Sequence, residues 1–371
     1  MFTFFIFLFE VSAEEIDLKA KSAILIEEST GNVIYEKNAD EKLSPASMTK
    51  IMSLILIMEQ IESGKLDKND DVMVSKEASS MGGSQVFINE GEVYKVDELL
   101  KSVAIASAND AVVALSEKVA GTKDGFVEEM NKKAKLLNLK NTFFKNPHGI
   151  DEDGHYSTAR DMSMMAKELI SHNDILNYTK RYEDYFRKKD GSQIWLVNTN
   201  KLVKFYEGMD GLKTGYTSNA GYCLTATAKR NNLRLISVVM GEESIENRTE
   251  DTLKLLNYGF NSIKKDVLFD NKKNIDTLNL DYATKKGVKV YLKNSIVRVN
   301  NINGDKVKYK YELKYDKLKL PIKKNAKVGT IIVKTNDNKM YKQDLIVKDS
   351  ISKQSFISIY KNILNVIVNG L

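Results

Sequence analysis

A serine and a lysine lie three residues apart in the stretch SPASMTK, as Ser47 and Lys50. A serine hydroxyl needs an adjacent base to act as a nucleophile, and a lysine can be that base when burial or a nearby cation lowers its pKa. The apolar run that follows predicts a buried helix ending at Gly64. Ser44 followed by Pro45 is a helix-cap and first-turn signal, so Ser47 is predicted in the first turn, where free backbone N–H groups favour anionic charge.

The Ser-x-x-Lys spacing is not specific by itself, because it recurs at Ser262, Ser350 and Ser358. Only Ser47 precedes a buried helix, and this context favours it. A histidine base is the other common way to activate a serine. No histidine lies in a nucleophile-elbow context such as Gly-x-Ser-x-Gly, and we expect His148 and His155 to be structural or surface groups and not catalytic ones. The serine-lysine pair is the better candidate.

Two further stretches complete a set of three motifs. Ser107-Ala108-Asn109 lies between two helical patterns, and Lys213-Thr214-Gly215 lies just before a strand pattern. Chance rarely assembles Ser-x-x-Lys, Ser-x-Asn and Lys-Thr-Gly in this order. The combination is the signature of penicillin-binding proteins and serine β-lactamases.

The resemblance extends beyond the three motifs. The stretches PASMTKIMSLIL, ASSMGGSQVF, LLKSVAIASANDA, NPHGIDEDGHYSTARDM and GLKTGYTSNAGYCLTATAKR resemble the D-alanyl-D-alanine carboxypeptidases, the low-molecular-mass penicillin-binding proteins. The similarity is continuous over about residues 20–262. It implies a serine-type carboxypeptidase that removes the terminal D-alanine from peptidoglycan stem pentapeptides. It also implies β-lactams as covalent inhibitors, and neither a metal nor a cofactor.

The resemblance implies a catalytic role for three side chains. Ser47 would attack the carbonyl between the two D-alanines and form an acyl-enzyme, and Lys50 would take its proton. Ser107 would relay a proton toward the leaving amine. The backbone N–H groups of Ser47 and Tyr216 would form the oxyanion hole.

The other motif residues are implied to bind the substrate. Asn109 would hydrogen-bond the peptide backbone. Lys213 would hold the terminal carboxylate and help to lower the pKa of Lys50, with Thr214 assisting at the carboxylate. Gly215 would let the substrate approach the strand closely.

Other functions for the same motif set stay open. A β-lactamase shares the chemistry but must release the acyl group quickly. Class A enzymes use a glutamate-activated water for this step, and we identify no equivalent glutamate here. A D,D-endopeptidase would differ only in pocket details. A non-catalytic penicillin-binding sensor would retain the pocket without turnover, although the complete motif set argues against it.

Periodic patterns predict an α+β domain over residues 14–262, with helices packed on an antiparallel sheet as in the penicillin-binding/β-lactamase-like fold that the resemblance implies. Residues 22–35 form two apolar runs around a turn and predict a hairpin. Cys223 is the only cysteine, so no intrachain disulfide forms, and we expect it to be a small hydrophobe in a strand. Helices are expected at 96–106, 111–120, 126–137, 159–170 and 249–258, and further strands at 221–229 and 233–239.

Residues 263–349 predict a small basic all-β domain. The segment 307–320 alternates tyrosine or leucine with lysine and predicts a half-buried strand, and the segment 330–347 predicts a hairpin. The domain holds 22 Lys or Arg against 10 Asp or Glu. Its basic surface either faces anionic lipid or wall polymer, or is simply a solvated face. We expect no nucleic-acid partner.

The two ends of the chain predict export and membrane association. Residues 1–13 are interpreted as the remains of a signal peptide cut after Ala13, with a buried first strand as the alternative. Residues 350–371 are too polar to span a bilayer and fit an amphipathic helix in the membrane interface, or a helix docked on the β domain. We expect a protein at the outer face of the cytoplasmic membrane or in the cell wall.

Overall fold

The chain divides into two compact units, Met1–Ser262 and Ile263–Leu371. A computed structural model describes residues 16–302, 304, 307–357 and 360. The predicted signal peptide at 1–13 lies outside the described residues. The division falls where the sequence pattern becomes basic and strand-like.

A five-stranded antiparallel sheet in the order β2-β1-β9-β8-β7 forms the centre of the first unit. Helices cover both of its faces, so β1 is buried at every position, and its residues 23–26 form a continuous apolar run. The hairpin predicted at 22–35 and the strands predicted at 221–229 and 233–239 are confirmed. The strands are β1 (Ser22–Glu27), β2 (Val33–Lys37), β7 (Met209–Thr217), β8 (Gly221–Arg230) and β9 (Leu233–Glu242).

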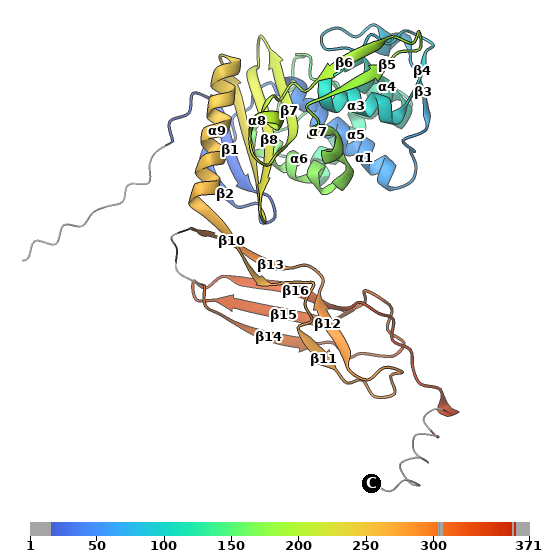
Figure 1. The fold of residues 1–371 in the computed structure, drawn as a ribbon, viewed down its shortest axis with the longest axis vertical. Helices are drawn as coiled ribbons and strands as arrows, with labels where there is room; N and C mark the ends of the chain where they lie inside the picture. Colours follow the sequence, from blue (N-terminus) through green and yellow to red (C-terminus); the bar gives the residue numbers. More distant parts are fainter. Residues whose placement is uncertain (1–15, 303, 305–306, 358–359, 361–371) are drawn as a thin grey trace, which may run out of the picture. The chain divides into compact units, whose positions relative to one another are not determined.

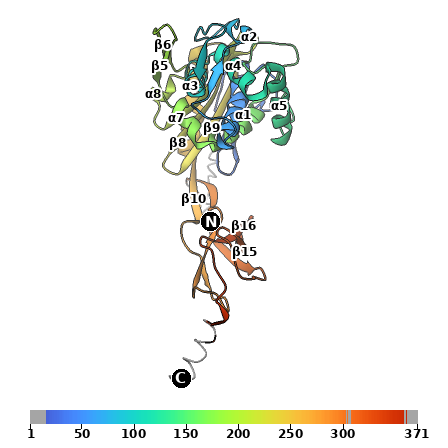
Figure 2. The same ribbon diagram turned by 90° about the vertical axis from the view of Figure 1, so that its right-hand side faces the viewer.

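Helix α9 (Ile245–Ser262) lies along one face of this sheet, and the other helices of the unit cover the opposite face (Figure 1). Gly259 permits the close approach of α9, because a Cβ atom there would lie 2.6 Å from Leu235 and 2.8 Å from Leu25. On the opposite face, helix α1 (Lys50–Glu62) is buried from Lys50 to Met58. It packs against α4, α5 and α6, and α5 is seen beside it in Figure 2. The almost wholly apolar sequence of α1 is thereby explained.

Every predicted helix of the first unit is present. Helices α4, α5 and α9 begin a few residues before their predicted ranges. Their first turns are largely polar and therefore lack the apolar periodicity on which the prediction depended. For α5, the Thr122 side chain accepts a hydrogen bond from the Gly125 N–H and caps the helix. The remaining helices are η1 (Ala46–Thr49), α2 (Lys76–Ser79), α3 (Val96–Ala106), α4 (Asn109–Ala120), α5 (Lys123–Leu136), α6 (Ala159–Ser171), η2 (Asn173–Ile175), α7 (Leu176–Thr179) and α8 (Leu202–Phe205).

Two short antiparallel pairs of strands were not predicted. Strands β3 (Asp71–Met73) and β4 (Val93–Lys95) have three residues each, too few for a periodic pattern. Strands β5 (Glu183–Arg187) and β6 (Gln193–Val197) are partly exposed and include polar residues at both faces. The predicted α+β class, with helices packed on an antiparallel sheet, is confirmed for this unit.

The helices and strands that the structure describes in the second unit as far as Val347 are all β-strands. Its five-stranded sheet has the order β11-β12-β16-β15-β14, and β10 pairs with β13 in a two-stranded sheet. The hairpin predicted at 330–347 is confirmed. The strands are β10 (Ile263–Phe269), β11 (Asp276–Leu278), β12 (Val288–Leu292), β13 (Ile296–Asn301), β14 (Tyr309–Tyr315), β15 (Lys327–Thr335) and β16 (Met340–Val347).

Strand β14 is less buried than its alternating sequence predicts. Leu313 and Tyr315 pack against the core of the second unit. Tyr309 and Tyr311 stay exposed and make edge-to-face contacts with Phe269 instead. The strand is at the edge of its sheet, where only part of one face is covered.

The segment after β16 belongs to the second unit, which corrects the expectation that a separate tail begins at residue 350. Ile351 is buried, and its backbone exchanges hydrogen bonds with that of Ile322 at 2.8 and 2.9 Å. The Gln354 N–H donates to the carbonyl oxygen of Tyr282 at 2.7 Å. Most of the predicted amphipathic helix lies outside the described residues. Among the residues that the structure describes, no helix has the length and apolar character needed to cross a membrane.

Candidate active site

A single turn of 3-10 helix, η1, carries Ser47 into the site. The predicted cap by Ser44 is wrong, because its hydroxyl donates to Asp151 Oδ1 at 2.6 Å instead of capping the helix. Pro45 occupies the N-cap position, and Ser47 lies in η1 just before α1 begins at Lys50. The local sequence correctly indicated that a helix starts here. It could not indicate that the Ser44 hydroxyl would bond to Asp151, more than a hundred residues later, instead of capping the helix.

Ser47 and Lys50 are in hydrogen-bond contact. Lys50 Nζ lies 3.0 Å from Ser47 Oγ. It also donates to the carbonyl oxygen of His148 at 2.7 Å, which fixes the position of the amine. Ser47 is half-buried, so its hydroxyl is accessible, whereas Lys50 is fully buried. The geometry is that of a nucleophile with an adjacent base.

The surroundings of Lys50 favour its neutral form. Burial lowers the pKa of Lys50 well below its usual value, and the positive charge of Lys213 lowers it further. The carboxylate of Asp110 has the opposite, smaller effect. A neutral amine can accept the proton of Ser47, which an ammonium cannot.

Ser107 and Asn109 lie where α3 ends and α4 begins. Ser107 has a φ of 65°, the left-handed conformation that turns the chain between the two helices. Asn109 is held through its side-chain amide, which donates to the Gly82 carbonyl oxygen at 2.7 Å, and through its N–H, which donates to that of Ser84 at 2.6 Å. The Ser107 hydroxyl and Asn109 Oδ1 are both buried without a partner among the described residues. Unpaired buried polar atoms of this kind are rare and suit a ligand-binding role.

Lys213, Thr214 and Tyr216 come from β7, the edge strand of the sheet. Lys213 is buried, and its ammonium donates to the carbonyl oxygen of Thr214 at 3.1 Å. Burial, with a smaller contribution from the positive charge of Arg248, lowers the pKa of Lys213 to about 7. Tyr216 is exposed and stacks on Tyr222 of β8, with ring centroids 4.3 Å apart.

Gly215 has a packing role in addition to the substrate approach that the sequence predicts. A Cβ atom at this position would lie 2.8 Å from the carbonyl oxygen of Pro45 and 3.3 Å from the Met48 backbone nitrogen. The glycine therefore lets β7 pack directly against η1, the turn that carries Ser47. The lack of a side chain at Gly215 sets the distance between β7 and η1. The sequence alone suggested only that this glycine leaves room for the substrate.

The loop 146–155 is the part of the site that sequence reasoning missed. Its His148 carbonyl holds Lys50, and its Gly149 has a φ of 89° at a place where a Cβ atom would lie 1.8 Å from the Ala46 carbonyl oxygen. His155 Nε2 lies 2.8 Å from the Thr49 hydroxyl, so its expected structural role is confirmed. The NPHG sequence was a signal for a tight turn, but its contact with η1 depends on tertiary packing.

The other Ser-x-x-Lys matches lack this arrangement in the described residues. Ser262 ends α9 and Lys265 lies in β10, so the two do not share a helix. Ser350 lies in the segment after β16, and its hydroxyl accepts from the Lys324 N–H. Cys223 is fully buried in β8, as expected of a small hydrophobe. Among the described residues, one group of three His, Cys, Asp or Glu side chains is close enough to share a metal ion. This group is Glu59, Glu168 and His172, and it lies away from Ser47.

Two protein-family models together match nearly the whole chain. The family described as D-alanyl-D-alanine carboxypeptidase, peptidase S11, matches residues 9–244. The family described as penicillin-binding protein 5, C-terminal domain, matches residues 264–353. D-alanyl-D-alanine carboxypeptidase DacF of Bacillus subtilis is 43% identical over 348 residues, which are 94% of this chain and 90% of the relative.

Solved structures have the same architecture. Penicillin-binding protein 5 from Haemophilus influenzae is 29% identical, with a TM-score of 0.74 over 92% of this chain and 100% of that one. Penicillin-binding protein D2 from Listeria monocytogenes, in its ampicillin-bound form, is 32% identical, with a TM-score of 0.60 over 67% of this chain and 100% of that one. The chain therefore belongs to the peptidase S11 family of D-alanyl-D-alanine carboxypeptidases.

Proposed function

We propose that the chain is a serine-type D-Ala-D-Ala carboxypeptidase that trims peptidoglycan stem pentapeptides. The observation that carries the proposal is the contact of Ser47 Oγ with the Nζ of a fully buried Lys50 at 3.0 Å. Relatives that cover most of the chain bear the same activity in their names.

In the proposed reaction, neutral Lys50 takes the proton of Ser47 as the hydroxyl oxygen attacks the carbonyl carbon between the two D-alanines. The backbone N–H groups of Ser47 and Tyr216 stabilise the oxyanion, and one such donor typically contributes about 10²- to 10³-fold in rate. The bond to the terminal D-alanine breaks, and Ser107 relays a proton to its leaving amine. Water then hydrolyses the acyl-enzyme and restores Ser47. The unpaired Ser107 hydroxyl supports this relay.

The proposed substrate contacts use the remaining motif residues. Asn109 Oδ1, which has no partner among the described residues, accepts a hydrogen bond from the bound peptide. Protonated Lys213 and the hydroxyl of Thr214 bind the terminal carboxylate. The two contacts require a free carboxylate at the end of the peptide, which favours a carboxypeptidase over an endopeptidase.

The proposal extends to inhibitors and to cellular location. A β-lactam would acylate Ser47 as the substrate does, and the ampicillin-bound and cefotaxime-bound forms of the Listeria relative support this. An activity on the cell wall supports a location outside the cytoplasm. We infer attachment to the membrane surface through residues after 355, where Phe356, Ile357 and Tyr360 are exposed apolar side chains.

The test measures release of D-alanine from a pentapeptide ending in D-Ala-D-Ala. Ser47→Ala should reduce release to background and abolish a covalent penicillin adduct that mass spectrometry maps to this residue. Ser350→Ala is the matched control, since it has the same Ser-x-x-Lys pattern without the site and should retain activity. Release that persists in Ser47→Ala would overturn the assignment. Rapid turnover of penicillin would favour a β-lactamase, and a stable adduct without release of D-alanine would favour a sensor.

A further inference from the structure

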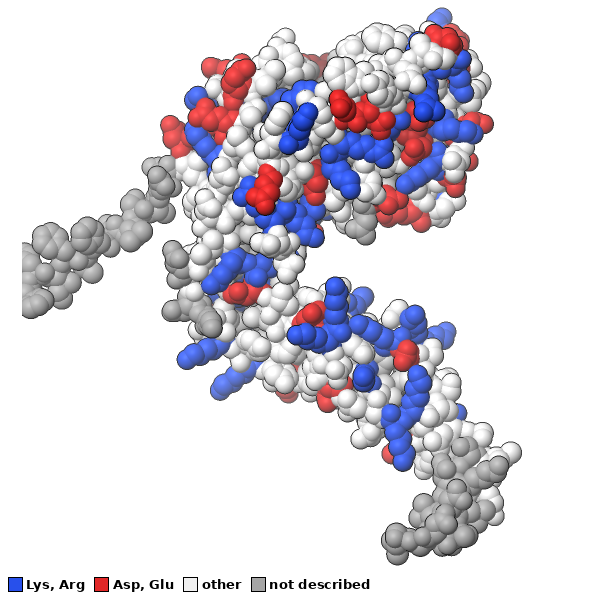
Figure 3. All heavy atoms as spheres, viewed as in Figure 1, with Lys and Arg blue, Asp and Glu red and all other residues white. Residues whose placement is uncertain are grey.

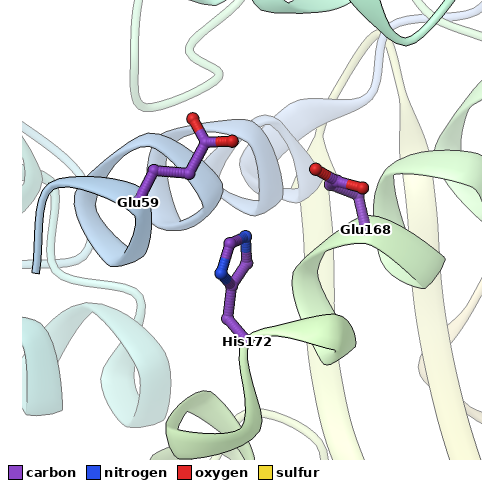
Figure 4. Close-up of side chains that lie close together, drawn as sticks. All are labelled: Glu59, Glu168 and His172. Carbon is purple, nitrogen blue, oxygen red and sulfur yellow. The ribbon is translucent and has the colours of Figure 1, made fainter. Parts of the chain in front are cut away.

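Three side chains at the ends of two packed helices converge away from the active site. Glu59 lies in α1, Glu168 in the last turn of α6, and His172 at the C-cap of α6. One potential ligand atom from each lies within 4.8 Å of the other two. Figure 4 shows the imidazole between the two carboxylates, with one ring nitrogen directed toward the space that separates them. We call these three residues the Glu-Glu-His cluster.

The histidine is held in the orientation that a metal ligand needs. Its Nδ1 lies 2.8 Å from Glu62 Oε2, and its side chain is only 8% exposed. In the neutral imidazole that donates Nδ1–H to Glu62, the lone pair is on Nε2. This Nε2 atom is buried and has no hydrogen-bond partner among the described residues. Metal-ligating histidines usually donate their other N–H to a carboxylate in the same way.

A lysine now neutralises the two carboxylates. Lys133 Nζ from α5 lies 2.5 Å from Glu59 and 2.7 Å from Glu168. The Lys133 ammonium pairs with both carboxylates, but the structure shows no hydrogen bond between it and His172 Nε2. A divalent cation would interact with both carboxylates and with the imidazole lone pair.

We propose that Glu59, Glu168 and His172 form a structural site for a divalent transition-metal ion of the zinc class, which competes with the Lys133 ammonium. A mixed set of imidazole and carboxylate ligands suits zinc, whereas calcium and magnesium prefer oxygen ligands only. Glu59 and Glu168 keep 33% and 30% of their side chains exposed, so water can complete the coordination. The ion would join α1 to α6 about 14 Å along α1 from Lys50, and takes no part in the acyl-transfer chemistry.

Zinc titration of the tag-free, chelator-treated full chain tests the site. Calorimetry should give saturable binding of one ion per chain. Thermal unfolding should shift upward with zinc, because free zinc at a hundred times its dissociation constant displaces the folding equilibrium about 100-fold toward the folded state. The absence of binding to the wild-type chain and to the Lys133 variant described next would overturn the proposal.

Three variants separate this site from adventitious binding. His172→Asn retains an N–H near Nδ1 for Glu62 but removes Nε2, and should weaken zinc binding at least 10-fold. Lys133→Met removes the competing ammonium and should tighten binding at least 10-fold. Glu128→Gln, an exposed residue on α5, is the control and should change neither affinity nor stoichiometry. Wild-type affinity in His172→Asn, or weaker binding in Lys133→Met, would contradict the site.

Discussion

At the scale of single residues, the two buried lysines Lys50 and Lys213 both have lowered pKa values but are proposed to have different roles. Lys50 contacts Ser47, and burial and the charge of Lys213 lower the pKa of Lys50 well below its usual value, which favours the neutral amine. The pKa of Lys213 is lowered to about 7, so its cation persists below neutral pH and can bind a carboxylate. In the proposed mechanism the same side-chain type is therefore a base at one position and a cation at the other, because their surroundings differ.

This division predicts a bell-shaped dependence of kcat/KM on pH. Activity should fall on the acid side as Lys50 becomes protonated, and on the alkaline side, above about pH 7, as Lys213 loses the proton that binds the substrate carboxylate. Lys213→Arg retains a cation throughout, so the alkaline decline should disappear while the acid decline remains. Release of D-alanine measured between pH 5 and pH 10 checks both limbs. An unchanged alkaline limb in Lys213→Arg would assign it to another group.

At the scale of elements, η1 is held between the loop 146–155 and strand β7. Gly149 approaches η1 at the carbonyl of Ala46, and Gly215 approaches it at the carbonyl of Pro45. The nucleophile is thus positioned by two backbone contacts that only glycine permits. A side chain at either position must displace η1, the loop or the strand.

Gly149→Ala should therefore be strongly destabilising. The variant combines a left-handed backbone, which costs about 1–2 kcal/mol, with a steric clash, and we expect a loss of about 3 kcal/mol or more in the free energy of unfolding. Gly64→Ala is the matched control: its φ is also positive, at 72°, but nothing lies within 4 Å of its Cβ position, and it should cost about 1 kcal/mol. Urea denaturation measures both, and equal losses would show that the contact with η1 is not what matters.

Local sequence predicted the elements of the first unit well because its helices and buried strands have strong periodicity. It placed α3 at 96–106, as observed, and identified the lysine and serine that form the central contact. It could not indicate that Ser44 bonds Asp151 or that the His148 carbonyl holds Lys50, since both contacts join residues about a hundred positions apart. The Glu-Glu-His cluster was missed for the same reason, although Glu168 and His172 have helical spacing.

At the scale of the whole molecule, the basic surface belongs to the second unit. Lysine and arginine side chains predominate over this unit on the face drawn in Figure 3. Two of these lysines contact or belong to the segment that follows β16: Lys285 forms an ion pair with Asp349, and Lys353 forms an isolated β-bridge with Ala283. Such a surface would favour anionic lipid next to an interfacial helix.

Truncation after Ser355 should release the protein from membranes and leave carboxypeptidase activity intact. The cut must spare Ile351 and Gln354, because both bond to the second unit. Sedimentation with vesicles that contain anionic phospholipid measures binding, and release of D-alanine measures activity. Truncation after Asp349 is the comparison, and should additionally lower the thermal stability of the second unit. A Ser355 truncation that still sediments like the full chain would contradict the proposed anchor.

The place of β1 inside its sheet has a consequence for how the protein is made. This strand pairs on one side with β2 and on the other with β9, more than two hundred residues later. The central sheet cannot form completely until the chain has been synthesised as far as Glu242. Strand β1 therefore lacks one of its two neighbouring strands until then. Non-local pairing of this kind slows folding and exposes unfinished chains to aggregation. Slow folding would also suit the proposed location outside the cytoplasm, because a chain that has not yet folded can pass through a narrow export channel.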